Sequence, residues 1–223
     1  MKKLVIVILA MSSFFACNDD ILDVLPQDRI SEDLVWDDVN LIKAYHNGLY
    51  TGILHGFRIH MQSKATDEAY CAIGWDIGNV PLGTLTADNV TSVADTHWTG
   101  GGNLYYWNTG FQYVRKINVF LEEMAAEGAL EFEDKATLVA EAKFIRAYIY
   151  FLLIERFGGV PIVTESFGLG AEQSFDRNSF EECVEFIEQN LSEAIPDLPE
   201  KYAASDAAFG RAAQHACQAL RSR

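Results

Sequence analysis

Cys17 is the residue whose surroundings point most directly to chemistry. Before it come two lysines, an apolar run at residues 4–11 and Ala16, and after it come an asparagine and two aspartates. A basic start, a short apolar core and a small residue before a cleavage point are the parts of a secretory signal peptide. The stretch is also shorter than the about 20 residues that a spanning helix needs. We therefore expect residues 1–16 to be cleaved.

The cysteine at the expected cleavage point is typical of a bacterial lipoprotein, in which the new N-terminal cysteine carries acyl chains. Cys17 is thus the expected site of lipid attachment, and the protein would be tethered to a membrane by lipid. Phe14 stands where such signals usually have leucine. The alternative is an ordinary secreted protein with a cysteine at this position by chance.

Carboxylates are the next candidates for chemistry. Asp67, Glu68, Asp76 and Asp88 lie in one stretch that is rich in glycine and polar residues. A glycosidase needs two facing carboxylates about 5 to 9 Å apart. The spacing of these four residues imposes no such geometry, and a chain with 32 acidic residues has many carboxylates without a catalytic purpose. We expect no catalytic residue and no enzyme activity.

The sequence also lacks the usual patterns of a metal site or a nucleotide-binding loop. The five histidines form no HExxH pattern, and Cys71, Cys183 and Cys217 are widely spaced with no CxxC pair. Cys183 falls on the apolar face of an expected helix, which favours a buried thiol. The glycines at 100–102 lack the Lys-Ser/Thr of a phosphate-binding loop. We expect neither a metal nor a cofactor.

Composition and charge narrow the class of partner. The 223 residues are 49% hydrophobic and 22% charged, which is ordinary for a globular domain. The formal net charge is −15, and the signal peptide removes only two lysines and no acid. A surface of this sign repels phosphate backbones and anionic lipid headgroups, so nucleic-acid binding is disfavoured.

Aromatic side chains outside the expected helices could bind sugar, since the apolar face of a pyranose packs on a ring. Trp75 and Trp98 are the candidates for ligand binding, with Tyr105 a weaker one. Burial beneath the long loop is the alternative for both tryptophans. Trp107 instead falls on a helical stripe, and we expect it in the core.

Helices with intervening irregular loops are expected to position these groups. An N-cap and a helical stripe predict the second helix, Gly158-Gly159 ends the third, and Ser179 with Glu182 forms a capping box at the start of the fourth. Residues 55–102 show no lasting period. The expected helices cover residues 33–53, 103–128, 134–157 and 179–194, and a fifth begins near 205, while 160–164 could form a short extended piece.

Particular side chains carry further expectations. Asn118, polar on an apolar stripe, should make a buried hydrogen bond, and Arg146 should pair with a carboxylate on a neighbouring helix. The fourth helix should bury an apolar face, and the last helix should leave an exposed apolar stripe if its partners are absent. These faces consist of Phe180, Val184, Ile187, Leu191 and Ala194 in the fourth helix and of Ala212, Ala216 and Leu220 in the last.

One long motif resembles a known family. The stretch 141–163, EAKFIRAYIYFLLIERFGGVPIV, is similar to the EAxFLRAxxYFxLxxxFGGVPLV signature of SusD/RagB outer-membrane lipoproteins. Other stretches follow in family order: Leu22-Asp23 and Pro26 after the cysteine, Asp67-Glu68, the WxxxYxxIxxxN pattern from Trp107 to Asn118, and Gly210-Arg211-Ala212 for the GRAT motif. Ala213 and His215 depart from the usual continuation of that last motif.

The resemblance implies an all-α fold of tetratricopeptide-like helix pairs with long irregular loops. It also implies a surface-exposed lipoprotein of the outer membrane that binds nutrient, usually an oligosaccharide, for a TonB-dependent SusC-like transporter. The acidic pair after Cys17 is similar to the export signal of such lipoproteins. Family members run to about twice this length, so residues 17–223 correspond to a helical N-terminal domain that is incomplete at its C-terminus.

Three other interpretations stay open at this point. The protein could bind peptide in the manner of RagB, or it could be a helical-repeat scaffold that recognises only another protein. The chain could also be a remnant without function.

The lipid anchor gives the first testable prediction. Several acyl chains hold a protein firmly on a bilayer, whereas a protein without them has no comparable attachment. Cys17→Ala should therefore release the protein from membranes or stall its processing, as measured by membrane fractionation and mass spectrometry of the N-terminus. Wild-type protein processed in parallel is the control. A mutant that is correctly cleaved and still membrane-bound would contradict the assignment.

Overall fold

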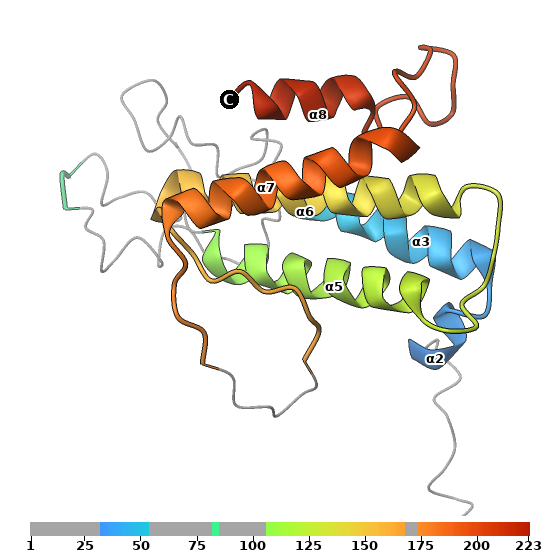
Figure 1. Cartoon of the computed structure of the whole chain (residues 1–223), viewed down its shortest axis with the longest axis horizontal. Coiled ribbons are helices and arrows are strands. Elements are labelled where there is room, and N and C mark those ends of the chain that lie inside the picture. The colour runs from blue at the N-terminus through green and yellow to red at the C-terminus, as the bar shows by residue number, and fades with distance from the viewer. Residues whose placement is uncertain (1–31, 54–81, 85–105, 168–173) are drawn as a thin grey trace, which may run out of the picture.

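The computed structural model describes residues 32–53, 82–84, 106–167 and 174–223 (Figure 1). Throughout these ranges the regular secondary structure is helical, which confirms the all-α expectation. In the described residues, no helix has the length and apolar character that crossing a membrane would require. The α-helices are α2 (Glu32–Val35), α3 (Val39–Leu49), α5 (Trp107–Ala125), α6 (Lys135–Phe157), α7 (Phe180–Ala194) and α8 (Gln214–Arg221), with 3-10 turns η3 (Tyr50–Gly52) and η5 (Ile195–Asp197).

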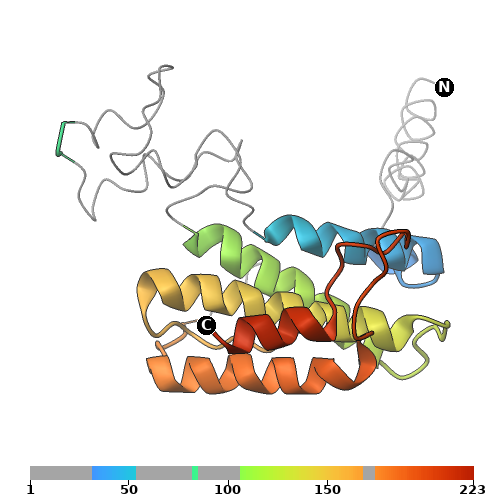
Figure 2. The same cartoon turned by 90° about the horizontal axis from the view of Figure 1, so that it is seen from above.

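The long helices lie side by side and alternate in direction (Figures 1 and 2). α5 runs antiparallel to α3, α6 to α5, and α7 to α6, while α8 turns back along α7. α6 is the central element, because it packs against both α5 and α7 and also contacts α3. This stack of antiparallel helix pairs is the expected tetratricopeptide-like arrangement.

The sequence of α6 explains its central place. Twelve of its 23 residues are buried, and they face every side of the helix, so no polar face is left for solvent. A helix that is apolar all round must be covered on several sides. Each fully buried Leu or Ile contributes about 1.5 to 3 kcal/mol through removal of apolar surface from water. The signature stretch therefore forms the core against which the other helices pack.

The first expected helix, 33–53, is divided in two. Asp38 lies in an extended conformation, and its carboxylate accepts a hydrogen bond of 2.7 Å from the backbone N–H of Asn40. This cap begins α3 at Val39 and separates it from α2. The prediction of one continuous helix was wrong because Asp38 is more stable as an N-cap than in the interior of a helix.

The two glycines that end α6 have different structural reasons. Gly158 has a φ of +69°, a region that residues with a side chain rarely adopt. Gly159 has an ordinary φ, but a Cβ there would lie 2.1 Å from the backbone oxygen of Asn178. The first glycine thus turns the chain, and the second lets the segment before α7 approach closely. Residues 160–164 form no strand, although Val160 accepts a backbone hydrogen bond of 3.2 Å from Asn178.

The capping box of α7 is confirmed, but part of its expected buried face is wrong. Ser179 and Glu182 exchange the two reciprocal hydrogen bonds of the box. Phe180 is 54% exposed and Val184 38% exposed. The buried stripe consists instead of Cys183, Ile187, Asn190, Leu191 and Ala194. Cys183 faces the core because its thiol donates a hydrogen bond to the backbone carbonyl of Val160 and accepts one from the backbone N–H of Val160.

The last helix begins later than expected. α8 starts at Gln214, whereas residues 204–211 form turns that include Gly210 with a φ of +97°. Its apolar stripe is also not exposed: Ala212 and Leu220 are buried and Ala216 packs against the core cluster. The expectation of an uncovered stripe was wrong, because the turn returns α8 onto α7.

Asn118 and Arg146 form a buried polar connection across three helices. The amide Nδ2 of Asn118 donates to the carbonyls of Val163 and Glu165, as expected for a buried hydrogen-bonded group. Arg146 pairs with no carboxylate among the described residues, which corrects the prediction: it donates to the side-chain oxygens of Asn118 at 3.0 Å and Asn190 at 2.8 Å. Two neutral amide oxygens therefore replace the expected ion pair.

Removal of the Asn118 amide should reveal the strength of this connection. Asn118→Ala removes the acceptor of Arg146 Nη1 and the amide donor to the carbonyls of Val163 and Glu165, and an unsatisfied buried group costs about 1 to 3 kcal/mol. We expect the free energy of unfolding, measured by urea denaturation, to fall by about that amount. Gln112→Ala, which removes an exposed amide from the same helix, should change it by less than about 0.5 kcal/mol. Equal effects of the two substitutions would contradict the assignment.

Candidate functional site

The residues that the sequence marked for binding and anchoring lie outside the described ranges. This holds for Cys17, Trp75 and Trp98, and also for the loop carboxylates from Asp67 to Asp88. Among the described residues, no group of three or more His, Cys, Asp or Glu side chains could hold a metal ion. The concave surfaces that the described helices form are therefore the remaining candidates for a binding site.

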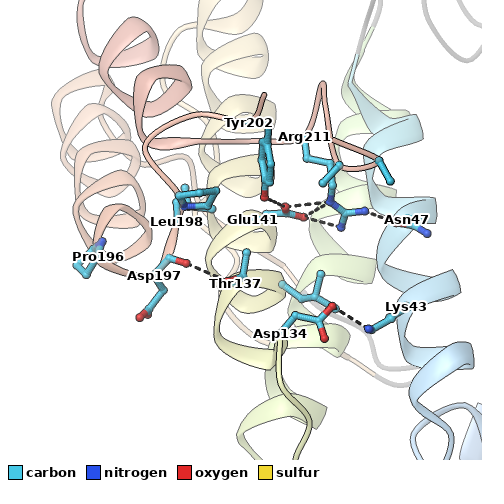
Figure 3. A pocket seen from close by; sticks show the side chains of 14 residues that line it. Lys43, Asn47, Asp134, Thr137, Glu141, Pro196, Asp197, Leu198, Tyr202 and Arg211 are labelled. Carbon is cyan, nitrogen blue, oxygen red and sulfur yellow. Dashed lines mark hydrogen bonds and ion pairs between the residues drawn. The ribbon is translucent and has the colours of Figure 1, made fainter. Parts of the chain in front are cut away.

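The larger concave surface is a polar groove between α3, α6 and the segment 196–211 (Figure 3). Its volume is about 620 Å³. Leucine, proline and alanine side chains form its apolar part, and charged residues lie between them. The lining residues are Lys43, Asn47, Asp134, Thr137, Leu138, Glu141, Pro196, Asp197, Leu198, Pro199, Tyr202, Ala207, Ala208 and Arg211.

A buried ion pair forms the floor of this groove. The side chain of Glu141 on α6 is 1% exposed, and Arg211 approaches it from the turn before α8. Arg211 Nε donates to both carboxylate oxygens at 3.0 Å, and its Nη2 donates to Oε2 at 2.6 Å. The phenol of Tyr202 donates to Oε1 at 3.2 Å. Such a multiply bonded pair offsets the cost of burying the charge.

α3 contributes two further partners to Arg211. Its Nη1 donates to the side-chain oxygen of Asn47 at 2.8 Å, and its Nη2 lies 3.0 Å from Nδ1 of the buried His46. Arginine has no acceptor, so Nδ1 of His46 must be the unprotonated nitrogen and Nε2 must carry the hydrogen. Among the described residues, that Nε2 makes no hydrogen bond of ordinary geometry, although the Leu138 backbone is nearby and Oε2 of Glu141 lies 3.5 Å away.

Burial and a neighbouring cation make the imidazole of His46 harder to protonate. Burial and the Arg211 guanidinium lower the pKa of His46 from 6.5 to about 4. The carboxylate of Glu141 would favour the protonated form, but Arg211 already neutralises it. A second proton would have to enter at Nδ1, against a guanidinium. Burial and the same carboxylate raise the pKa of the Tyr202 phenol to about 12, so this group is neutral at physiological pH.

The polar groups of this groove are mostly bonded to one another. Lys43 pairs with Asp134 at 2.8 Å, and Thr137 donates to the carbonyl of Asp197 at 3.1 Å. Because the Glu141 carboxylate is buried, a ligand in the groove would contact its partners and not the carboxylate itself. The groove is therefore a structural junction that joins α3, α6 and the turn before α8, with a surface that can hydrogen-bond a polar ligand only at its rim.

The second concave surface is smaller and of different chemistry. This aromatic groove has a volume of about 340 Å³ and lies between α5 on one side and residues 161–167 with Phe175 on the other. Val114 and Pro161 are buried at its floor, and Arg115 and Glu165 are exposed at its rim. Its remaining lining residues are Trp107, Phe111, Val163, Phe167 and Phe175.

Contacts across and within its two walls fix the shape of the aromatic groove. Arg115 Nε donates to the carbonyl of Phe167 at 3.2 Å, which ties α5 to the opposite wall. The rings of Phe167 and Phe175 lie 5.3 Å apart, and that of Trp107 lies 5.0 Å from Phe111. Trp107 was expected in the core and is only half-buried. Its position in the WxxxYxxIxxxN pattern indicates a core residue and gives no sign that it lines a concave surface.

The sequence of this chain matches a known protein family. Residues 20–223 match the sequence pattern of a SusD-like family described as starch-binding and associating with the outer membrane. The chain belongs to this SusD-like family. The expectation drawn from the signature stretch 141–163 is thereby confirmed.

Three known proteins are similar to part or most of this chain. A SusD-like protein of Formosa agariphila is 26% identical over 143 residues, which are 63% of this chain and 25% of the relative. A solved SusD-like protein of Bacteroides fragilis is 28% identical with a TM-score of 0.65, over 89% of this chain and 37% of its own. A SusD-like carbohydrate-binding protein from the same species shares the fold, with 24% identity, a TM-score of 0.64, and coverage of 85% and 37%. The chain thus spans well under half the length of these relatives.

The buried imidazole of the SusD-like chain predicts a pH dependence. Because the pKa of His46 falls from 6.5 to about 4 on folding, the unfolded chain binds a proton between these values that the folded chain does not. The stabilising contribution is present above about pH 6.5 and is lost as the pH falls through 4. His46→Gln should remove about 2 to 3 kcal/mol of this pH dependence from the free energy of unfolding.

Urea denaturation between pH 4 and pH 7 measures this effect. His215→Gln is the matched control, because the side chain of His215 is 54% exposed and its loss should leave the slope against pH unchanged. If the wild-type chain and His46→Gln have parallel profiles, the neutral buried imidazole is refuted.

Proposed function

We propose that the protein is a surface-exposed lipoprotein of the outer membrane that binds oligosaccharide and delivers it to a TonB-dependent SusC-like transporter. The observation that carries this proposal is the family match over residues 20–223, whose description names starch and the outer membrane. The lipid on Cys17 would hold the protein at the membrane, and the helix stack would present its loops to the ligand. Binding requires no enzyme chemistry and no cofactor.

Two relatives support the family assignment on which this ligand class rests. The name of the Formosa agariphila protein says that it is SusD-like, and the solved Bacteroides fragilis protein at 28% identity carries the same description. Sugar recognition would combine ring faces for the apolar side of a pyranose with polar groups for its hydroxyls. Trp75 and Trp98 are our candidates for such stacking.

Retention on polysaccharide tests the ligand class. The full chain, purified in mild detergent, should be retarded in native gels that contain soluble starch, and alanine substitution of Trp75 or Trp98 should weaken the retardation. Leu34→Ala, at a residue that is 53% exposed on α2, is the control and should not. Gels without polysaccharide provide the reference mobility.

Isolation of the protein from its own membranes tests the partner. A SusC-like barrel should co-purify with it. Co-purification of a barrel without retention on any of starch, laminarin or xylan would favour the scaffold alternative. Retention of peptides but of no polysaccharide would favour a RagB-type receptor.

A further inference from the structure

We propose that the aromatic groove between α5 and the described residues 161–167 and Phe175 is a glycan-binding subsite, in which a pyranose ring stacks on Phe175. The proposal rests on the proposed function, because it gives the oligosaccharide a defined place on the described helices. It is independent of Trp75 and Trp98, which lie in another part of the sequence.

The walls of the groove supply the apolar half of sugar recognition. Four of its nine lining residues are aromatic, and they come from both sides: Trp107 and Phe111 from α5, Phe167 and Phe175 from the opposite segment. An aromatic face carries partial negative charge and attracts the C–H hydrogens of a sugar ring. Phe175 is 42% exposed, so its ring is accessible to a ligand before any rearrangement.

The rim supplies the polar half. Arg115 has five N–H donors, of which one is used on the carbonyl of Phe167, and the Glu165 carboxylate is an acceptor for several hydrogen bonds. Sugar hydroxyls both donate and accept, so they can satisfy a cation and an anion at the same time. A purely apolar occupant would offer these two charged groups no hydrogen bond in place of the water that it displaced. A nucleotide would meet the electrostatic repulsion of a chain with a net charge of −15.

The groove is also held in shape without a ligand. Asn118 donates from α5 to the carbonyls of Val163 and Glu165, which fixes the backbone of the wall that ends at Phe167. Arg115 ties the same wall to α5 one turn earlier. A preformed site loses less conformational entropy on binding. The volume of about 340 Å³ lies at the small end of ligand pockets, which suits one segment of an oligosaccharide whose remainder lies outside.

The polar groove of Figure 3 lacks this combination. Its central groups, Glu141 and Arg211, are bonded to each other and to α3, and it presents one aromatic side chain, Tyr202. The aromatic groove is therefore the better subsite for a sugar ring.

Two substitutions of Phe175 separate ring stacking from apolar bulk. Phe175→Leu keeps an apolar side chain but removes the flat face, and we expect it to weaken affinity for soluble starch, measured in native affinity gels of the full chain, by about three- to tenfold. Phe175→Tyr keeps the face and should bind like wild type. The affinity of both is compared on the polysaccharide, among starch, laminarin and xylan, that retards wild type most strongly.

Phe209→Leu is the matched control. Phe209 is 63% exposed, and its turn lies at the other end of the helices from the start of α5 (Figure 1), so its substitution should leave affinity unchanged. Thermal unfolding checks that each variant is folded. Wild-type affinity in Phe175→Leu, or an equal loss in Phe175→Tyr, overturns the subsite but not the proposed function. A wild-type chain that no polysaccharide retards overturns the proposed function and this subsite with it.

Discussion

The ion pair between Glu141 and Arg211 is the interaction on which the arrangement of the helices depends most. Glu141 lies inside the central helix, and a carboxylate in such a place needs a fully bonded partner. Arg211 comes from a turn 70 residues later and also contacts Asn47 on α3. One guanidinium thus joins the first, the central and the last parts of the described fold. Loss of either partner of such a pair leaves a buried charge, which costs about 3 to 5 kcal/mol.

The helical core could be predicted from the sequence because its signals are local. The apolar surround of α6, the capping box at Ser179 and the glycines after Phe157 each specify one structural outcome. The errors arose where a tertiary contact decided between similar local choices. Cys183 and Asn190 turn α7 away from the face that apolar bulk alone predicts, since the thiol meets Val160 and the amide meets Arg146. Arg146 donates to amide oxygens, and no sequence pattern indicates that pairing.

The candidate sites were less predictable than the core. The aromatic groove brings together Phe111 and Phe175, whose separation in the sequence hides their proximity in space. Trp107 lies at a helical spacing that indicates a core position, and its partial exposure depends on how the segment after Pro161 returns across α5. Glu141 and Arg211 do lie in recognisable motifs, but only the structure shows that they bond to each other. Trp75 and Trp98 lie outside the described residues, so their role stays a prediction.

The burial of α6 on all sides has a consequence for the order in which the chain can fold. α5 precedes α6 in the chain and α7 follows it, so a chain that emerges N-terminus first presents α6 before one of its two main partners. Until α7 is present, an apolar surface of α6 has no complete cover; it includes Tyr150, whose ring centroid lies 4.9 Å from that of Phe186 on α7. Transiently uncovered apolar surface of this kind promotes aggregation of nascent chains. The segment that carries the family signature is thus also one that exposes apolar surface while the chain is incomplete.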